Sequence, residues 1–264
     1  MKKLLLSIAA SSLVFVALNH SVAMAQPATS TATPSTPVYA VLSLIGDRLD
    51  IIVARQQTGT RIDANLRESV SISNAVFDSA AVSAIAEAVR KINSKAELAA
   101  INTRSAVLFE KQRELFAQSG DKILIPDAIR SAVKDQNATH LFLVTKRRDD
   151  ASAQFVGGSS DGKGRIEGLG FYLDGSMSTK VSETGAGGRG FIAPFVYIDV
   201  ALIEMASSKI ISKEKVVASR PVSAGQAVKD VGSPWEALSS AEKVRLVNAI
   251  IQDEIARVVP VLLK

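Results

Sequence analysis

The sequence contains no cysteine, and only 5% of its residues are aromatic. The absence of cysteine excludes disulfides, thiolate metal ligands and attachment of a lipid to a cysteine at the amino terminus. The low aromatic content argues against a surface that stacks bases or sugar rings. Only two histidines are present, His20 and His140, which are too few for a zinc site. We therefore expect no metal and no cofactor.

Residues 1–25 have the features of an export signal. Lys2 and Lys3 form the charged start, residues 4–18 form an apolar run, and Ala23-Met24-Ala25 supplies the small residues that signal peptidase requires. The apolar run is shorter than the roughly 20 residues of a membrane-spanning helix. An uncleaved anchor is the alternative. Cleavage before Gln26 predicts a periplasmic protein that is not lipidated, with no membrane span in the mature chain.

Composition narrows the partners that the mature chain could bind. Loss of Lys2 and Lys3 lowers the formal net charge from +5 to +3. A mild positive excess is compatible with an anionic envelope surface. Export argues against nucleic acid as the partner, so an envelope protein or a cell-wall component is expected instead.

The rest of the chain reads as a tether followed by one domain. Residues 26–37 are rich in Pro, Thr, Ser and Ala and are predicted to be a disordered linker. Residues 38–264 are predicted to form a single α/β (α+β) domain, with one mixed sheet and about four helices. A weaker strand over 66–72 should turn Leu66, Val70 and Ile72 inward. The helices are expected at residues 79–93, 105–116, 126–137 and 239–260, the last with a capping box at Ser239 and Glu242.

Residues 194–219 are predicted to form a long hairpin at the centre of the sheet. Its first arm is apolar on both faces, apart from Asp199, which is typical of a strand covered on both sides. Its second arm has polar residues on both faces, around Ser212 to Lys215, which favours a sheet edge or a strand that leaves the core midway.

Eleven of the sixteen glycines lie between Gly157 and Gly190. Because glycine weakens regular structure, residues 149–190 are predicted to be a glycine-rich loop region, divided by a short strand over 166–173. Lys163, Arg165 and Arg189 are the candidate binding residues of this region.

Three motifs in this region match known sites only in their letters. Residues 157–164 (GGSSDGKG) have glycine where a phosphate loop needs a hydroxyl. Residues 158–162 (GSSDG) resemble a nucleophile elbow, but no helix is expected to follow them. Residues 185–190 (GAGGRG) precede a strand, whereas the dinucleotide fingerprint precedes a helix. We expect no catalytic residue among them.

Two polar residues are expected within buried strands. His140 begins an apolar strand and Asp199 interrupts another, so each is predicted to be a hydrogen-bonded or ion-paired structural residue. The alternative is that His140 and Asp199 form the titratable pair of a hydrolase.

The order of elements also resembles a known family. VYAVLSLI, ELAAINT, NATHLFLVTKRR and VYIDVALIEMASSKIISKEKVVAS follow one another as in the periplasmic α/β domain of the lipoprotein activators of penicillin-binding proteins, the curli secretion lipoprotein and the Tol translocation protein. The resemblance implies an exported, non-catalytic accessory protein that docks on an envelope partner. A periplasmic hydrolase and a small-ligand-binding protein, each with an unidentified site, are the alternatives.

Overall fold

The computed structural model describes residues 37–55, 65–72, 74–155, 158–180, 187–223, 235 and 238–264, without the side chains of 153–163, 176–190 and 223. The expected export signal therefore lies outside the described residues, as does the expected linker except for Pro37. The described elements, in chain order, are β1 (Val38–Leu44), β2 (Arg48–Val53), β3 (Leu66–Ser71), α1 (Val76–Ile92), β4 (Glu97–Ile101), α2 (Ala106–Glu110), α3 (Gln112–Leu115), β5 (Gln118–Ser119), β6 (Lys122–Ile123), α4 (Asp127–Asp135), β7 (His140–Lys146), β8 (Arg148–Phe155), β9 (Gly158–Lys180), β10 (Gly187–Glu204), β11 (Lys209–Ser219), β12 (Val222–Ser223) and α6 (Ser240–Leu262).

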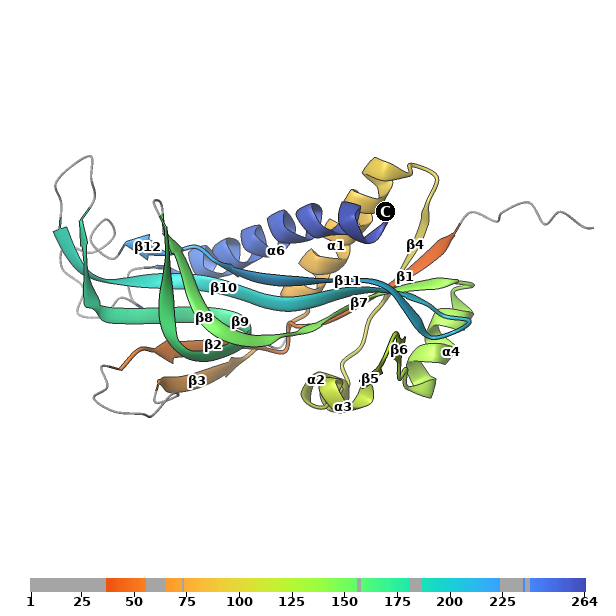
Figure 1. Ribbon diagram of the computed structural model, residues 1–264, viewed down its shortest axis with the longest axis horizontal. Helices are drawn as coiled ribbons and strands as arrows, with labels where there is room; N and C mark the ends of the chain where they lie inside the picture. The colour runs from red at the N-terminus through yellow and green to blue at the C-terminus, as the bar shows by residue number, and fades with distance from the viewer. Residues whose placement is uncertain are drawn as a thin grey trace, which may run out of the picture. The chain divides into compact units, whose positions relative to one another are not determined.

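Strand β10 is the centre of a mixed β-sheet, which confirms the predicted fold class and central hairpin (Figure 1). One edge of β10 pairs with β11. The other edge pairs first with β9 and then, from Ile198 onward, with β7. The sheet therefore divides at β10 into two branches, one running through β9, β2 and β3 and the other through β7, β1 and β4.

The hairpin of β10 and β11 contains one irregularity. Leu202 pairs with Ser212 but Ile203 pairs with Ile210, so Ile211 has no residue opposite it on β10. This β-bulge leaves the Ile211 side chain 49% exposed. Beyond the bulge, the outer edge of β11 has no strand partner among the described residues except at Lys209, which pairs with β6. The predicted edge character of β11 is confirmed.

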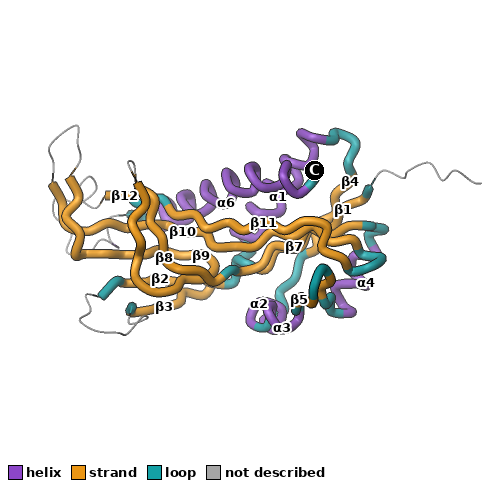
Figure 2. Tube along the Cα trace, viewed as in Figure 1, coloured by secondary structure: helices purple, strands orange, loops and turns teal. Residues whose placement is uncertain are grey.

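Helices α1 and α6 lie side by side on one face of the sheet (Figure 2). The predicted capping box of α6 is present, because the Ser239 hydroxyl accepts from the Glu242 N–H and the Glu242 carboxylate accepts from the Ser239 N–H. The helix continues two residues past Pro260, which was expected to end it. The main hydrophobic core lies between these helices and inward residues such as Val196 and Ile198.

The opposite face of the sheet has two separate coverings. Near β1 and β7, the segment from α2 to α4 packs on Leu141, Leu143 and Ile203. Near the start of β10, strand β8 folds back on β9 and packs above Phe195 and Tyr197. The hydrophobic clusters under these two coverings are distinct, so the sheet face between them is open to a ligand.

Three local expectations differ from the structure. The helix expected over residues 105–116 is two short helices, because the chain turns at Lys111. Strand β3 is exposed throughout, because it pairs only with β2, at the end of its branch, and no described element covers it; Leu66 and Val70 therefore do not face the core. Most of the residues in the glycine-rich region lie in strands β8, β9 and β10. Glycine serves close packing here, since a Cβ on Gly170 would lie 2.0 Å from the Asp50 carbonyl oxygen.

Candidate functional site

A cleft of about 510 Å³ lies on the sheet face between the two coverings. Six of its lining residues are lysine or arginine and one is an acid, Asp199. Five of these cationic side chains belong to the wall, because the Lys146 side chain lies opposite Ile198, on the other face of the sheet, and pairs with Asp47. The full lining is Gln112, Arg113, Phe116, Gln118, Ile123, Leu143, Thr145, Lys146, Arg147, Arg148, Arg165, Asp199, Ala201, Ile210 and Lys213. The volume falls in the range of about 300–1,000 Å³ that is typical of small-ligand sites.

The floor of the cleft is formed by alternate residues of adjacent strands. Asp199 and Ala201 of β10 face the cleft, and Lys213 of β11 lies opposite Ala201. Thr145 of β7 lies opposite Asp199. Because side chains alternate between the faces of a strand, their neighbours Ile198 and Val200 point into the core beneath α6.

Gln112 anchors the first covering to the sheet at the edge of the cleft. Its side-chain amide donates to the Leu44 carbonyl at 3.1 Å and to the Phe109 carbonyl at 2.7 Å. Its side-chain oxygen accepts from the Lys146 N–H at 2.7 Å. Only 4% of the residue is exposed. Gln112 therefore continues the hydrogen bonding between β1 and β7 at the point where β1 ends, and fixes the start of α3 there.

Asp199 is held between two cations in the floor. Its two carboxylate oxygens lie 3.1 Å from Arg147 and 3.0 Å from Lys213. The side chain is 15% exposed, so its charge is partly desolvated and depends on these partners. Arg147 also bonds Asp149, and this hydrogen bond is the main reason why the pKa of Asp149 lies below its usual value.

Tyr197 fixes the second covering. Its hydroxyl accepts from the Ser152 N–H at 2.9 Å and donates to the Asp150 carbonyl at 3.2 Å. Burial raises its pKa to about 12. The Ser219 hydroxyl also donates to the Ser152 carbonyl, at 2.6 Å. Strand β8 is thus attached to the side chains of both strands of the central hairpin.

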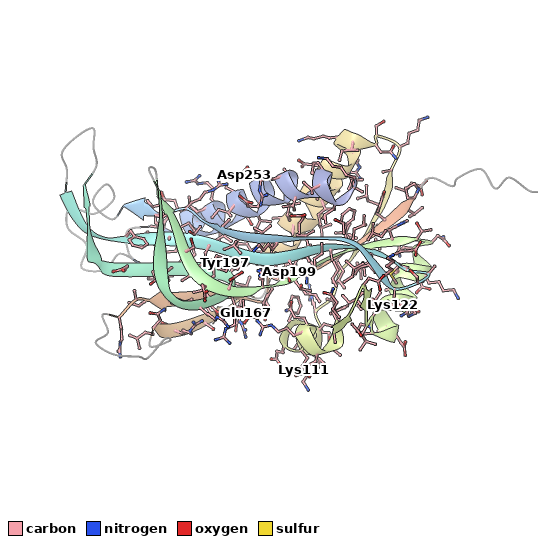
Figure 3. All side chains as sticks on the ribbon, in the orientation of Figure 1. Lys111, Lys122, Glu167, Tyr197, Asp199 and Asp253 are labelled. Carbon is pink, nitrogen blue, oxygen red and sulfur yellow. The ribbon has the colours of Figure 1, made fainter. Side chains whose placement is uncertain are left out.

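Arginines gather at the mouth of the cleft around Glu167 of β9. Arg113 of α3 lies 2.8 Å from the Glu167 carboxylate. Arg148 of β8 is directly opposite Glu167 in the strand register, and Arg165 is two residues before it on the same strand. Arg165 pairs with Asp150 at 3.1 Å. We call Arg113, Arg148 and Arg165 the arginine cluster; Figure 3 shows Glu167 among the side chains near α3.

His140 and Asp199 do not form a pair. The register of β7 and β10 places His140 opposite Glu204 and Asp199 opposite Thr145. Five residues of strand separate the two positions, or about 17 Å. His140 instead contacts the Tyr39 ring at 5.6 Å and the Thr139 hydroxyl at 2.8 Å. Burial is the main cause that lowers its pKa. The hydrolase pair expected as an alternative is therefore not assembled.

The three cations suggested by the sequence have different positions. Arg165 lies in the wall of the cleft and is exposed. Lys163 and Arg189 belong to β9 and β10, but their side chains lie outside the described residues. Arg113 and Lys213 were not proposed from the sequence, and Arg148 stands there in a basic run, Lys146-Arg147-Arg148, whose contact with Asp149 and Asp150 indicated a solvated strand end.

The described part of the chain has neither a recognisable metal site nor a membrane-spanning helix. No group of three or more His, Cys, Asp or Glu side chains is arranged to hold a metal ion there. None of the described helices is long and apolar enough to cross a membrane.

Comparison with known proteins gives only distant structural likenesses. No family model and no curated protein matches this sequence. Protein XCC0632 from Xanthomonas campestris, a DUF330 protein, is 9% identical with a TM-score of 0.34; the match covers 86% of this chain and 85% of that one. A homolog of the neuraminyllactose-binding hemagglutinin from Helicobacter pylori is 8% identical with a TM-score of 0.33, covering 86% and 85%. The hypothetical protein CT253 from Chlamydia trachomatis is 11% identical with a TM-score of 0.28, covering 85% and 98%. At these TM-scores the likenesses carry no argument about function.

Most of the charged groups that line the cleft are guanidinium and ammonium groups, which hold anions by hydrogen bonds and charge. A general base would need a titratable group near neutral pH, and His140 lies on another part of the sheet. The described wall of the cleft therefore has the groups to hold an anionic ligand and lacks an imidazole to move its protons.

Proposed function

We propose that this protein is an exported, non-catalytic binding or accessory protein of the bacterial cell envelope, and that it holds its partner in the cleft. The observation that carries the proposal is the cleft itself, with five cationic side chains in its wall and a hydrogen-bonded support on each side. Gln112 fixes one side and Tyr197 fixes the other. A preformed site of this kind binds without the cost of ordering its walls.

Export is supported by the start of the sequence. The charged residues Lys2 and Lys3, the short apolar run and Ala23-Met24-Ala25 have the order of a signal peptide. Release before Gln26 places the domain in the periplasm, where anionic envelope components and the acidic surfaces of other proteins are available. A cationic cleft complements both kinds of partner.

The proposal is tested by capture of a partner from envelope extracts with tagged protein covering residues 26–264. The informative variant is Arg113→Glu, which places a carboxylate beside Glu167 at the cleft mouth. Arg257→Glu is the matched control, because Arg257 is also paired with a glutamate and its side chain is 59% exposed, against 55% for Arg113. We expect the parent and the control to capture the same partner, and Arg113→Glu to capture at least tenfold less.

Equal capture by all three proteins would show that the partner binds elsewhere. Failure of the parent to retain any envelope component would overturn the docking function itself. Thermal melting of each variant accompanies the capture, because a loss of folded protein would also reduce binding.

A further inference from the structure

Glu167 occupies the position that a bound anion would take in the arginine cluster. One guanidinium, that of Arg113, contacts its carboxylate directly at 2.8 Å. Arg148 faces it across the β8–β9 pair, and Arg165 stands on the same face of β9 two residues away. Side chains at such positions lie about 5–7 Å apart, within the reach of an arginine. Three arginines are thus placed around one carboxylate, and one of them contacts it directly.

The ion pairs of the cluster can be exchanged for pairs with a ligand. The Arg113 side chain is 55% exposed and that of Glu167 is 26% exposed. The pair of Arg165 with Asp150 is more exposed still. Ion pairs between exposed side chains contribute little, because water and salt screen them. An incoming anion therefore loses little by displacing Glu167 or Asp150 from its arginine.

The ion pairs of Asp199 in the floor of the cleft are harder to exchange than those at the mouth. Asp199 is less exposed and bonds both Arg147 and Lys213. Removal of either partner would leave a partly buried charge, so this group is expected to keep its arrangement when a ligand binds. The exchangeable ion pairs are consequently those at the mouth, and their arginines come from both coverings: Arg113 from the first and Arg165 from the second.

We propose that the arginine cluster binds a phosphate-type oxyanion, and that Glu167 is the internal group which the oxyanion displaces. Arginine presents a planar fork that bonds two oxygens of a phosphate at once. A phosphate monoester carries about −1.5 to −2 charges at pH 7, more than the single charge of Glu167, and therefore gains more from three guanidinium groups. This inference rests on the proposed binding function and gives its ligand a chemical class.

A bound oxyanion would also connect the two coverings. Arg113 now reaches across the mouth of the cleft to Glu167, so this ion pair joins α3 to β9. An oxyanion placed between Arg113 and Arg165 would keep that connection through the ligand. The simplest opposing explanation is that the Arg113–Glu167 pair only ties the coverings together and binds nothing.

The two explanations predict opposite effects of Glu167→Gln. If the cluster is an oxyanion site, its affinity for the oxyanion rises when the competing carboxylate becomes neutral. If the Arg113–Glu167 pair only joins the two coverings, the substitution weakens that connection and creates no binding. Glu254→Gln is the matched control, because Glu254 is 19% exposed and pairs with Arg257 on α6, away from the lining of the cleft. Arg113→Ala removes one guanidinium of the cluster.

Calorimetric titration of residues 26–264 with inorganic phosphate measures these effects. We expect Glu167→Gln to bind phosphate at least tenfold more tightly than the parent, Glu254→Gln to match the parent, and Arg113→Ala to bind at least tenfold more weakly. Urea unfolding confirms that each variant is folded. If Glu167→Gln binds phosphate no more tightly than the parent, or if no protein of the set binds it, the inference is wrong.

The source of the oxyanion is resolved by two further probes, glycerol phosphate and vesicles of phosphatidylcholine with and without phosphatidic acid. If glycerol phosphate and the phosphatidic acid vesicles both bind, and both bind more tightly to Glu167→Gln, the site recognises the phosphate group alone. Enhanced binding of glycerol phosphate without vesicle binding supports a small soluble ligand, and enhanced binding only of the phosphatidic acid vesicles supports a lipid headgroup. Retained partner capture with no phosphate binding would overturn this inference and leave the docking function standing.

Discussion

Replacement of Gln112 by alanine should destabilise the protein at the edge of the cleft. The Lys146 N–H would lose its side-chain acceptor in a buried place, which costs about 1–3 kcal/mol. The lost bond to the Leu44 carbonyl costs about 0.5–1.5 kcal/mol more. We expect the free energy of unfolding to fall by about 2–4 kcal/mol, out of a total of roughly 5–15 kcal/mol.

Urea unfolding of the parent, Gln112→Ala and Gln112→Met measures this effect. Methionine nearly restores the lost volume but supplies no donor and only a weak acceptor, so its protein should remain at least ~1.5 kcal/mol less stable than the parent. Gln118→Ala is the control, because Gln118 is exposed and donates only to the Gly120 carbonyl; it should change stability by less than ~0.5 kcal/mol. Full recovery in Gln112→Met would show that Gln112 acts by packing, and our hydrogen-bond argument would be refuted.

Three other predictions concern the core, the pH dependence and the amino terminus. Ile251 is fully buried, so Ile251→Asp should lower the free energy of unfolding by more than ~4 kcal/mol and abolish the thermal transition. The control Gln252→Asp should melt like the parent. If both variants melt like the parent, α6 lies outside the core. Burial raises the pKa of Asp78, so the contribution of this carboxyl to stability is present below pH 3.8 and is lost as pH rises through the raised pKa. Urea titrations should therefore show Asp78→Asn gaining stability relative to the parent from pH 4 to 7. A difference in stability that stays constant over this pH range would contradict the prediction. Mass spectrometry of exported protein should find Gln26 at the amino terminus, and an intact Met1 would contradict cleavage.

Elements whose signals are local could be predicted from the sequence. Helix α6 has its cap in Ser239 and Glu242 and its apolar stripe in successive turns, so both signals lie within one segment. The hairpin of β10 and β11 was equally accessible, since one arm is apolar on both faces and the short turn follows directly. Pro260 misled because α6 continues to Leu262 although proline supplies no N–H for a hydrogen bond to the preceding turn.

The glycine-rich region shows where composition fails. The glycine content indicated loops, but the backbone of β9 forms strand hydrogen bonds with its neighbours β2, β8 and β10. Gly170 is required because the Asp50 carbonyl and the Phe195 ring leave no room for a Cβ. Such contacts join distant parts of the chain, so no pattern within the glycine-rich region could predict them.

The candidate site was largely hidden for the same reason. Arg165 was singled out as a loop cation, yet its place in the cleft depends on the β8–β9 register. Arg113 reaches Glu167 only because Gln112 holds α3 against the sheet. Asp199 was recognisable as an unusual strand residue, but its partners come from elsewhere in the chain: Arg147 from the link between β7 and β8, and Lys213 from β11.

The bulge at Ile211 has a consequence for contact between copies of this protein. An open strand edge can add a strand from a neighbouring molecule, which leads to aggregation in a crowded compartment. The bulge interrupts the even spacing of backbone groups along β11, and Lys213 and Lys215 place positive charges beside the open stretch. A second copy approaching in antiparallel or parallel register would bring its own lysines close to these. Among the described residues, this edge of the hairpin therefore carries one extra residue and two lysines, of which Lys213 is paired with Asp199, and both features disfavour pairing with a second copy.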